Sequence, residues 1–179
     1  MPIDTRIATW NVNSLKVRLP HVLDWLKTAD VDVLCLQELK LANDKFPHES
    51  LREAGYECAV NGQKTYNGVA IVSRLPMADV VHDMPDYADE QKRVIAATIA
   101  GVRVVCAYFP NGQSLESDKY RYKLDWLDAM HGYMKAALTT HEKVSLLGDY
   151  NIAPEDRDVY DPVAWAGQIH CTPEEREHF

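Results

Sequence analysis

Four apolar segments of this chain each end in polar residues of the same restricted kind, and this pattern constrains the fold and function more than any other feature. The polar residues that follow the four segments are Asn11 and Asn13, Gln37 and Glu38, Tyr108 and Asn111, and Asp149 and Asn151. In layered α/β folds, the carboxyl ends of neighbouring strands gather at one edge, where ligands bind. We therefore expect these side chains to meet.

Strand-like and helix-like segments are mixed along the whole chain. β-branched and aromatic runs with few breakers predict strands over 5–11, 31–39, 56–60, 68–73 and 143–148, and a hairpin over 93–109 that turns at Ala100-Gly101. Apolar residues three or four positions apart predict a helix after Ser14, with Pro20 near its first turn, and a second over 117–138. A short helix within 41–55 that ends at Gly55 and the start of a helix in the last eight residues are also expected. This mixture predicts an α/β layered fold.

Composition excludes several classes of protein. With 19 Lys and Arg against 27 Asp and Glu, the net charge is −8, and 46% of the residues are hydrophobic. Such a balance favours one globular domain over residues 1–179. We expect no membrane span and no secretion signal, and the four widely spaced cysteines favour a reducing, cytoplasmic location. The acidic balance argues against bulk electrostatic binding of nucleic acid, but it is compatible with an enzyme that contacts phosphates through a bound cation.

The polar residues at the strand ends are oxygen ligands and hydrogen-bond donors. Carboxylates and amides suit Mg²⁺ or Mn²⁺, which keep water ligands and bridge to phosphates. The seven histidines show no zinc-site spacing. Each residue alone has a simpler interpretation: the asparagines as turn residues, Glu38 as a solvated residue and Tyr108 as core. The repetition of the pattern at four strands favours a site.

Six motifs, in this order, resemble those of the exodeoxyribonuclease III family, which belongs to the endonuclease/exonuclease/phosphatase superfamily. They are WNVNSL from Trp10, LQELK from Leu36, YNGVAIVSR from Tyr66, YFPNG from Tyr108, GDYNIAPEDRDV from Gly148 and CTPEERE from Cys171. The resemblance implies a four-layer α/β/β/α sandwich of the DNase I-like type. It also implies a divalent-metal-dependent hydrolase of DNA repair that incises duplex DNA at abasic sites and degrades 3′ ends as a 3′→5′ exonuclease.

The same resemblance assigns roles to the residues at the strand ends. Glu38 would be the principal ligand of Mg²⁺ or Mn²⁺, with Asn11 beside it. Asp149 would orient or deprotonate the attacking water, Asn151 would steady that water and the phosphate, and Tyr108 would bind the scissile phosphate.

Further residues fall in loops that contact the DNA backbone in relatives. They are Asn13, Lys16, Tyr66, Gly68 and Asn111. The implied partner is double-stranded DNA with abasic sites or 3′ ends, and the complete protein is expected to be a monomer that does not bind membranes.

The sequence departs from the family pattern at its C-terminal end. Family members continue into a later Asp and a Ser-Asp-His motif, which no histidine of this chain matches. The second sheet is therefore expected to be incomplete in this chain. A catalytically silent fragment that binds metal or DNA is the alternative function. A phosphatase acting on inositol phosphates and a sphingomyelinase are less consistent with the motifs. A secreted DNase I-like nuclease is less consistent with a sequence in which no signal peptide and no paired cysteines are expected.

Overall fold

A computed structural model describes residues 4–179 and divides the chain into two compact units. The first unit comprises the chain up to Tyr108 together with Ala137–Asp149. The second unit comprises Phe109–Ala136 and Tyr150–Phe179. Helix α3 (Asp118–Thr140) begins in the second unit and ends in the first. The prediction of a single domain over 1–179 stays a prediction.

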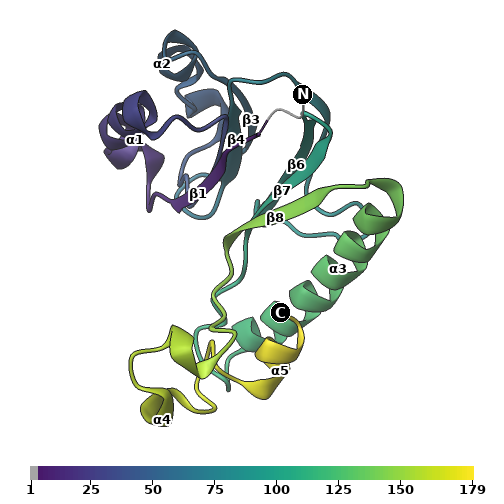
Figure 1. Cartoon of the computed structure of the whole chain (residues 1–179). Helices are drawn as coiled ribbons and strands as arrows, with labels where there is room; N and C mark the ends of the chain where they lie inside the picture. The colour runs from purple at the N-terminus through teal and green to yellow at the C-terminus, as the bar shows by residue number, and fades with distance from the viewer. Residues whose placement is uncertain (1–3) are drawn as a thin grey trace. The chain divides into compact units, whose positions relative to one another are not determined.

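The first unit contains two four-stranded mixed sheets (Figure 1). The first sheet has the order β1-β2-β4-β3, and its strands are β1 (Ile7–Asn11), β2 (Val33–Gln37), β3 (Glu57–Asn61) and β4 (Val69–Ser73). The second sheet has the order β5-β6-β7-β8, and its strands are β5 (Met77–His82), β6 (Val94–Ile99), β7 (Val102–Tyr108) and β8 (Val144–Asp149). Only the pairs β1–β2 and β7–β8 run parallel among these strands.

The two sheets pack face to face through small and branched apolar side chains. Cys35 and Ile71 of the first sheet belong to the same buried cluster as Ile95, Val104 and Cys106 of the second. Alternate residues of the strands point to opposite faces, so Leu34, Leu36 and Val72 point the other way. Burial on both faces explains why these strands have continuous apolar sequences.

Two helices cover the outer face of the first sheet (Figure 1). They are α1 (Leu15–Ala29) and α2 (His48–Glu53). Val22 and Leu26 of α1 and Leu51 of α2 are buried with the residues of that face. The first unit is thus layered in the order helix, sheet, sheet.

The second unit is built around aromatic side chains and short helices. Phe109 packs against Trp126 of α3 and against Tyr150, with ring centroids 4.9 and 4.5 Å apart. The other helical segments of the second unit are η2 (Asp156–Asp158), α4 (Pro162–Trp165) and α5 (Pro173–Glu177). Over residues 4–179, the structure contains no helix with both the length and the apolar character that a membrane span requires.

The predicted elements are present with a few differences. The segment 41–55 contains the expected short helix, α2, which ends at Glu53; a separate 3₁₀ turn, η1 (Asn43–Lys45), precedes it, and Pro47, which lacks a backbone N–H donor, lies between the two. Pro20 lies inside α1 and not in its first turn. Strand β5 was not predicted, because it is a largely exposed strand whose register shifts between Ala78 and Val81.

Gly148 is needed where β8 approaches β7. A Cβ added at Gly148 would lie 1.8 Å from the carbonyl oxygen of Ala107, its partner on β7. Gly148→Ala must therefore separate the two strands, and we expect a loss of at least about 1–3 kcal/mol in the free energy of unfolding. The measurement is denaturant unfolding. Gly132→Ala is the control, because nothing lies within 4 Å of the added Cβ in α3, and it should be neutral or stabilising. Equal stability of the two variants would contradict this account.

Candidate active site at the strand ends

Parallel pairing places the predicted site residues at neighbouring strand ends. Asn11, the last residue of β1, is in register with Gln37, which directly precedes Glu38. Tyr108, the last residue of β7, is in register with Asp149, the last residue of β8. The expectation that these side chains meet is confirmed for Asn11, Glu38, Tyr108 and Asp149, all in the first unit.

The side-chain amide of Asn11 joins two carboxylates that come from different sheets. Its Nδ2 donates to Oε1 of Glu38 at 2.7 Å and to Oδ2 of Asp149 at 2.8 Å. Glu38 adopts a left-handed backbone conformation with φ of 54°, which is unfavourable for a residue with a Cβ. Its main-chain carbonyl accepts a hydrogen bond from Ser14 N at 2.8 Å. The backbone strain is therefore held at a residue that aims a carboxylate at the site.

Lys40 is a site residue that sequence reasoning missed. Its Nζ lies 2.9 Å from Oε2 of Glu38 and 2.5 Å from Oδ1 of Asn13. Both charged side chains are partly shielded, with 30% of Lys40 and 19% of Glu38 exposed. The LQELK motif contains this lysine, but the left-handed conformation of both Glu38 and Lys40 is not visible in the sequence.

The surroundings keep Glu38 ionised and Tyr108 protonated. Burial raises the pKa of Glu38, but hydrogen bonds from Asn11, Lys40 and Tyr108 and the charge of Lys40 outweigh burial, so the pKa is lowered. Burial, together with the negative charge of Glu38, raises the pKa of Tyr108 to about 12. At neutral pH the site therefore offers a carboxylate and a neutral phenol that donates a hydrogen bond.

Arg93 contacts both the ring and the backbone of Tyr108, and sequence reasoning missed it as well. Its guanidinium lies 4.9 Å from the centroid of the Tyr108 ring, and its Nη1 donates to the Tyr108 carbonyl at 3.2 Å. Its Nη2 donates to Oε1 of Gln91, which also accepts from Nδ2 of Asn67. The available signal in the sequence was an arginine directly before the apolar run of β6.

The loop before β4 braces the segment that follows Glu38. Gly68 accepts a hydrogen bond from Leu39 N at 3.1 Å, and Asn67 accepts one from Lys40 N at 2.9 Å. Gly68 has a φ of 86°, and an added Cβ would lie 3.0 Å from Cβ of Leu39. The structure thus gives Gly68 a packing role beside Glu38, whereas its predicted contact with DNA stays a prediction.

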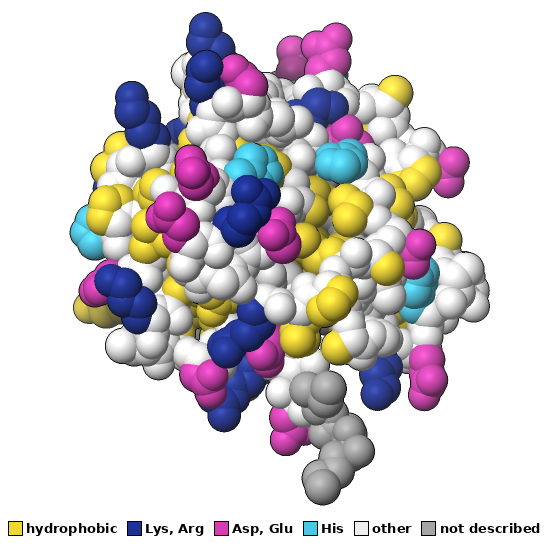
Figure 2. All heavy atoms as spheres, turned by 90° about the horizontal axis from the view of Figure 1, so that it is seen from above, with side chains coloured by type: hydrophobic (Ala, Val, Ile, Leu, Met, Phe, Trp, Pro, Cys, Tyr) yellow, Lys and Arg dark blue, Asp and Glu magenta, His cyan; other side chains and the backbone are white. Residues whose placement is uncertain are grey.

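Three other residues predicted to bind DNA lie at or near the surface of the first unit. Asn13 and Lys16 are exposed, and 66% of Tyr66 is exposed. Lysines and arginines are interspersed with acidic side chains on the face shown in Figure 2. The accessibility of Asn13, Lys16 and Tyr66 is compatible with phosphate contacts, which stay a prediction.

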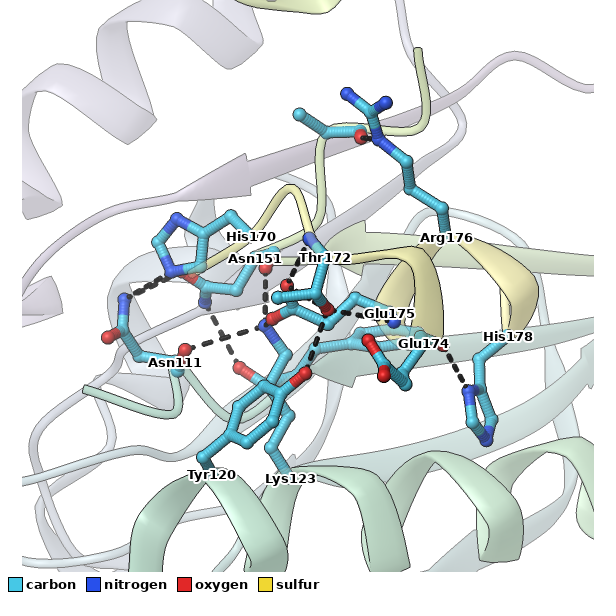
Figure 3. Close-up of polar contacts among 12 residues, drawn as sticks. Asn111, Tyr120, Lys123, Asn151, His170, Thr172, Glu174, Glu175, Arg176 and His178 are labelled. Atoms are coloured by element: carbon cyan, nitrogen blue, oxygen red, sulfur yellow. Dashed lines mark hydrogen bonds and ion pairs between the residues drawn. The ribbon is translucent and has the colours of Figure 1, made fainter. Parts of the chain in front are cut away.

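Asn111 and Asn151 meet in the second unit (Figure 3). Nδ2 of Asn111 donates to Oδ1 of Asn151 at 3.1 Å and lies 3.1 Å from Nε2 of His170. Nδ2 of Asn151 donates to the carbonyl of Phe109 at 3.0 Å. The predicted site residues therefore form two groups, one on each unit.

A buried ion pair lies in the same part of the second unit. Nζ of Lys123 lies 2.5 Å from Oε1 of Glu175, and both side chains are fully buried. Lys123 also donates to the carbonyl of Asn151 at 2.6 Å. Sequence reasoning missed the pair, because a lysine on a helix and a glutamate in a helical turn are normally solvated.

The carboxylate oxygens at the strand ends of the first unit are suitable ligands for a hard divalent cation. In the described part of the chain, no three His, Cys, Asp or Glu residues cluster as a metal-binding group. Mg²⁺ does not need such a cluster, because it commonly binds through one or two carboxylates and completes its shell with water and phosphate oxygens. Glu38, with Asp149 beside it, meets that requirement.

Comparison with known proteins gives a consistent result. The model of the Endonuclease/Exonuclease/phosphatase family matches residues 8–173. Exodeoxyribonuclease III of Haemophilus influenzae is 30% identical over 184 aligned positions, which cover 96% of this chain and 68% of that protein.

Solved structures extend the likeness to the fold. The 3′-5′ exonuclease NExo from Neisseria meningitidis is 52% identical with a TM-score of 0.95 over 97% of this chain and 68% of its own. A structure described as the 3′ phosphatase NExo from Neisseria, bound to a product DNA hairpin, is 50% identical with a TM-score of 0.96 over 98% and 68%. An AP endonuclease from Archaeoglobus fulgidus is 37% identical with a TM-score of 0.91 over 97% and 68%. The predicted α/β fold and family resemblance are confirmed.

Removal of the Asn11 amide should raise the pKa of Glu38, because the ionised carboxylate loses the strongest of its stabilising hydrogen bonds. The pKa is lowered from 4.5 in the folded protein, so Glu38 stabilises the fold at neutral pH, and this stabilisation is lost as the pH falls through the folded pKa. In Asn11→Ala the stabilisation that ionised Glu38 contributes at neutral pH should be smaller.

The measurement is a ¹³C NMR titration of the Glu38 carboxyl in the wild type and in Asn11→Ala. Lys16→Met, which changes an exposed residue in the first turn of α1, is the control. An unchanged titration midpoint in Asn11→Ala would show that the amide does not set the charge of Glu38.

Proposed function

The chain belongs to the Endonuclease/Exonuclease/phosphatase family, and we propose that it is a metal-dependent DNA-repair nuclease that hydrolyses phosphate esters at the 3′ oxygen of DNA. The observation behind the proposal is the meeting of Glu38 and Asp149 on one Asn11 amide, with the Tyr108 phenol bonded to Glu38. When water attacks a phosphate, the reaction requires carboxylates and a neutral hydrogen-bond donor, and this site offers two carboxylates and one such donor.

Each residue has a distinct task in such a reaction. Asp149 accepts the proton of the attacking water, and Tyr108 donates a hydrogen bond to the phosphate. Glu38, with Asn11 beside it, would hold Mg²⁺ or Mn²⁺, and the bound ion would supply stabilisation of the negative charge that develops on the phosphate and the leaving oxygen. Lys40, whose ammonium lies 2.9 Å from Glu38, offsets part of the negative charge of that carboxylate. Asn151 would contact the water and the phosphate, and Asn111 would contact the DNA backbone.

The names of the relatives favour chemistry at DNA 3′ ends. The two NExo structures, at 50% and 52% identity, are named for 3′ phosphatase and 3′-5′ exonuclease activity. Removal of a 3′ phosphate and removal of a 3′ nucleotide both break a bond between phosphorus and a 3′ oxygen. One site is therefore sufficient for both, and we propose 3′-end processing as the principal activity.

Incision at abasic sites is the second candidate activity. It is favoured by the 37% identity to the AP endonuclease of Archaeoglobus fulgidus and the 29% identity to the DNA repair nuclease APEX1 of Danio rerio. Cleavage that leaves a 3′ hydroxyl again breaks the bond to a 3′ oxygen, so the same catalytic groups serve. The two activities differ in how the DNA is bound.

The test uses the intact protein and three duplex substrates: one with a 3′ phosphate, one with a recessed 3′ hydroxyl and one with a single abasic site. With Mg²⁺ we expect phosphate release from the first and nucleotide release from the second, at higher kcat/KM than abasic incision. EDTA should abolish each reaction.

Asp149→Asn is the matched control for the chemistry. The asparagine retains an acceptor for the Asn11 amide but loses basicity, so kcat should fall by about 10²–10⁴-fold while DNA affinity changes little. Absence of Mg²⁺-dependent hydrolysis on all three substrates by the intact wild-type protein would overturn the proposed function. It would favour a silent, DNA-binding or metal-binding role.

A further inference from the structure

Lys123 is a fully buried cation whose hydrogen bonds reach two separate loops (Figure 3). Its Nζ donates to the main-chain carbonyl of Asn151 at 2.6 Å and to that of Asn111 at 3.4 Å. These residues lie in the chain segments that follow β8 and β7. One side chain of α3 thus holds both loops by their backbones.

Glu175 supplies the opposite charge and is itself held in place. Its Oε1 lies 2.5 Å from Lys123 Nζ, while its Oε2 accepts from Thr172 N at 3.1 Å and from Thr172 Oγ1 at 2.9 Å. The Glu175 N–H donates back to Thr172 Oγ1 at 3.1 Å, which completes a capping box at the start of α5. The position of the ammonium is therefore fixed by an anchored carboxylate.

Gly112 leaves room for the stem of Lys123. A Cβ at Gly112 would lie 3.1 Å from Cδ of Lys123 and 2.8 Å from Cδ1 of Ile169, and Gly112 has a φ of 89°. The loop next to Asn111 is thus shaped around the lysine side chain.

Stability alone does not account for such a pair. Removing two charges from water is costly, and an apolar pair of similar volume is often as stable or more stable. The charged pair adds directional hydrogen bonding that an apolar pair lacks, because an ammonium with a fixed counter-charge binds carbonyl oxygens at defined positions.

We propose that Lys123, with Glu175, is a positioning residue for Asn111 and Asn151. It fixes the backbones of the two loops, so that the amide of Asn111 and the amide of Asn151 keep their 3.1 Å hydrogen bond and a defined position relative to each other. The proposal rests on the proposed function, in which Asn151 contacts the reacting phosphate and Asn111 contacts the DNA backbone.

The experiment uses the intact protein with Lys123→Met and Glu175→Gln combined, so that neither charge is left buried alone. Lys119→Met is the control: it removes the same charge from an exposed position one turn earlier on α3. For each protein we measure thermal unfolding, kcat and KM on the 3′-phosphate duplex, and the side-chain amide NMR signals of Asn111 and Asn151. These signals are assigned with Asn111→Ala and Asn151→Ala.

The double variant should unfold cooperatively, lose at least about tenfold in kcat with little change in KM, and shift both amide signals. In an Asn151→Ala background, the same double substitution should have much less effect on kcat, because it acts through that residue. Lys119→Met should match the wild type in every measurement. Wild-type kcat and unchanged amide signals in a folded double variant would overturn the proposal.

Lys123→Gln with Glu175→Gln replaces the first variant if that variant does not fold. The side-chain nitrogen of glutamine at position 123 lies one bond closer to the backbone than the lysine ammonium. A loss of at least about tenfold in kcat in this variant therefore supports the proposal, and wild-type kcat overturns it. Failure of the proposed function is distinguishable, because it shows as an inactive wild-type protein, whereas failure of the positioning role shows as active variants with unchanged amide signals.

Discussion

The candidate site of the first unit depends on one hydrogen-bonding group, the side-chain amide of Asn11. Its nitrogen lies within 2.8 Å of carboxylate oxygens from Glu38 on the first sheet and Asp149 on the second. Two carboxylates repel each other, and a shared donor offsets part of that repulsion. Lys40 and Tyr108 bind Glu38 as well. The site thus keeps two negative charges close together, and such charges attract a divalent cation and serve as bases.

Sheet topology puts these groups together. β1 and β2 are parallel, as are β7 and β8, so each pair of strands ends at one edge. The packing of Cys35 and Ile71 against Ile95 and Cys106 fixes the two sheets to each other within this unit. Gly148 permits the close approach of β8 to β7 one residue before Asp149. The core thereby determines the geometry of the site.

The sequence predicted the strands and the residues at their ends, because burial on both faces leaves long apolar runs and the polar residues that follow stand out. It did not predict Lys40, Arg93 or the Lys123–Glu175 pair. Their importance comes from contacts between residues far apart in the chain, such as Lys123 with Glu175, and from backbone angles such as the positive φ of Glu38. Strand β5 was missed because an exposed, irregular strand lacks the apolar signal.

The most direct test of the central claim is a titration of the intact protein with Mg²⁺ and with Mn²⁺, followed calorimetrically, in the wild type and in Glu38→Ala. The account predicts one divalent-cation site in the wild type and a large loss of affinity in Glu38→Ala, which should still unfold cooperatively because a partly exposed carboxylate at a strand end contributes little to core packing. Equal affinity of the two proteins for both ions would contradict it.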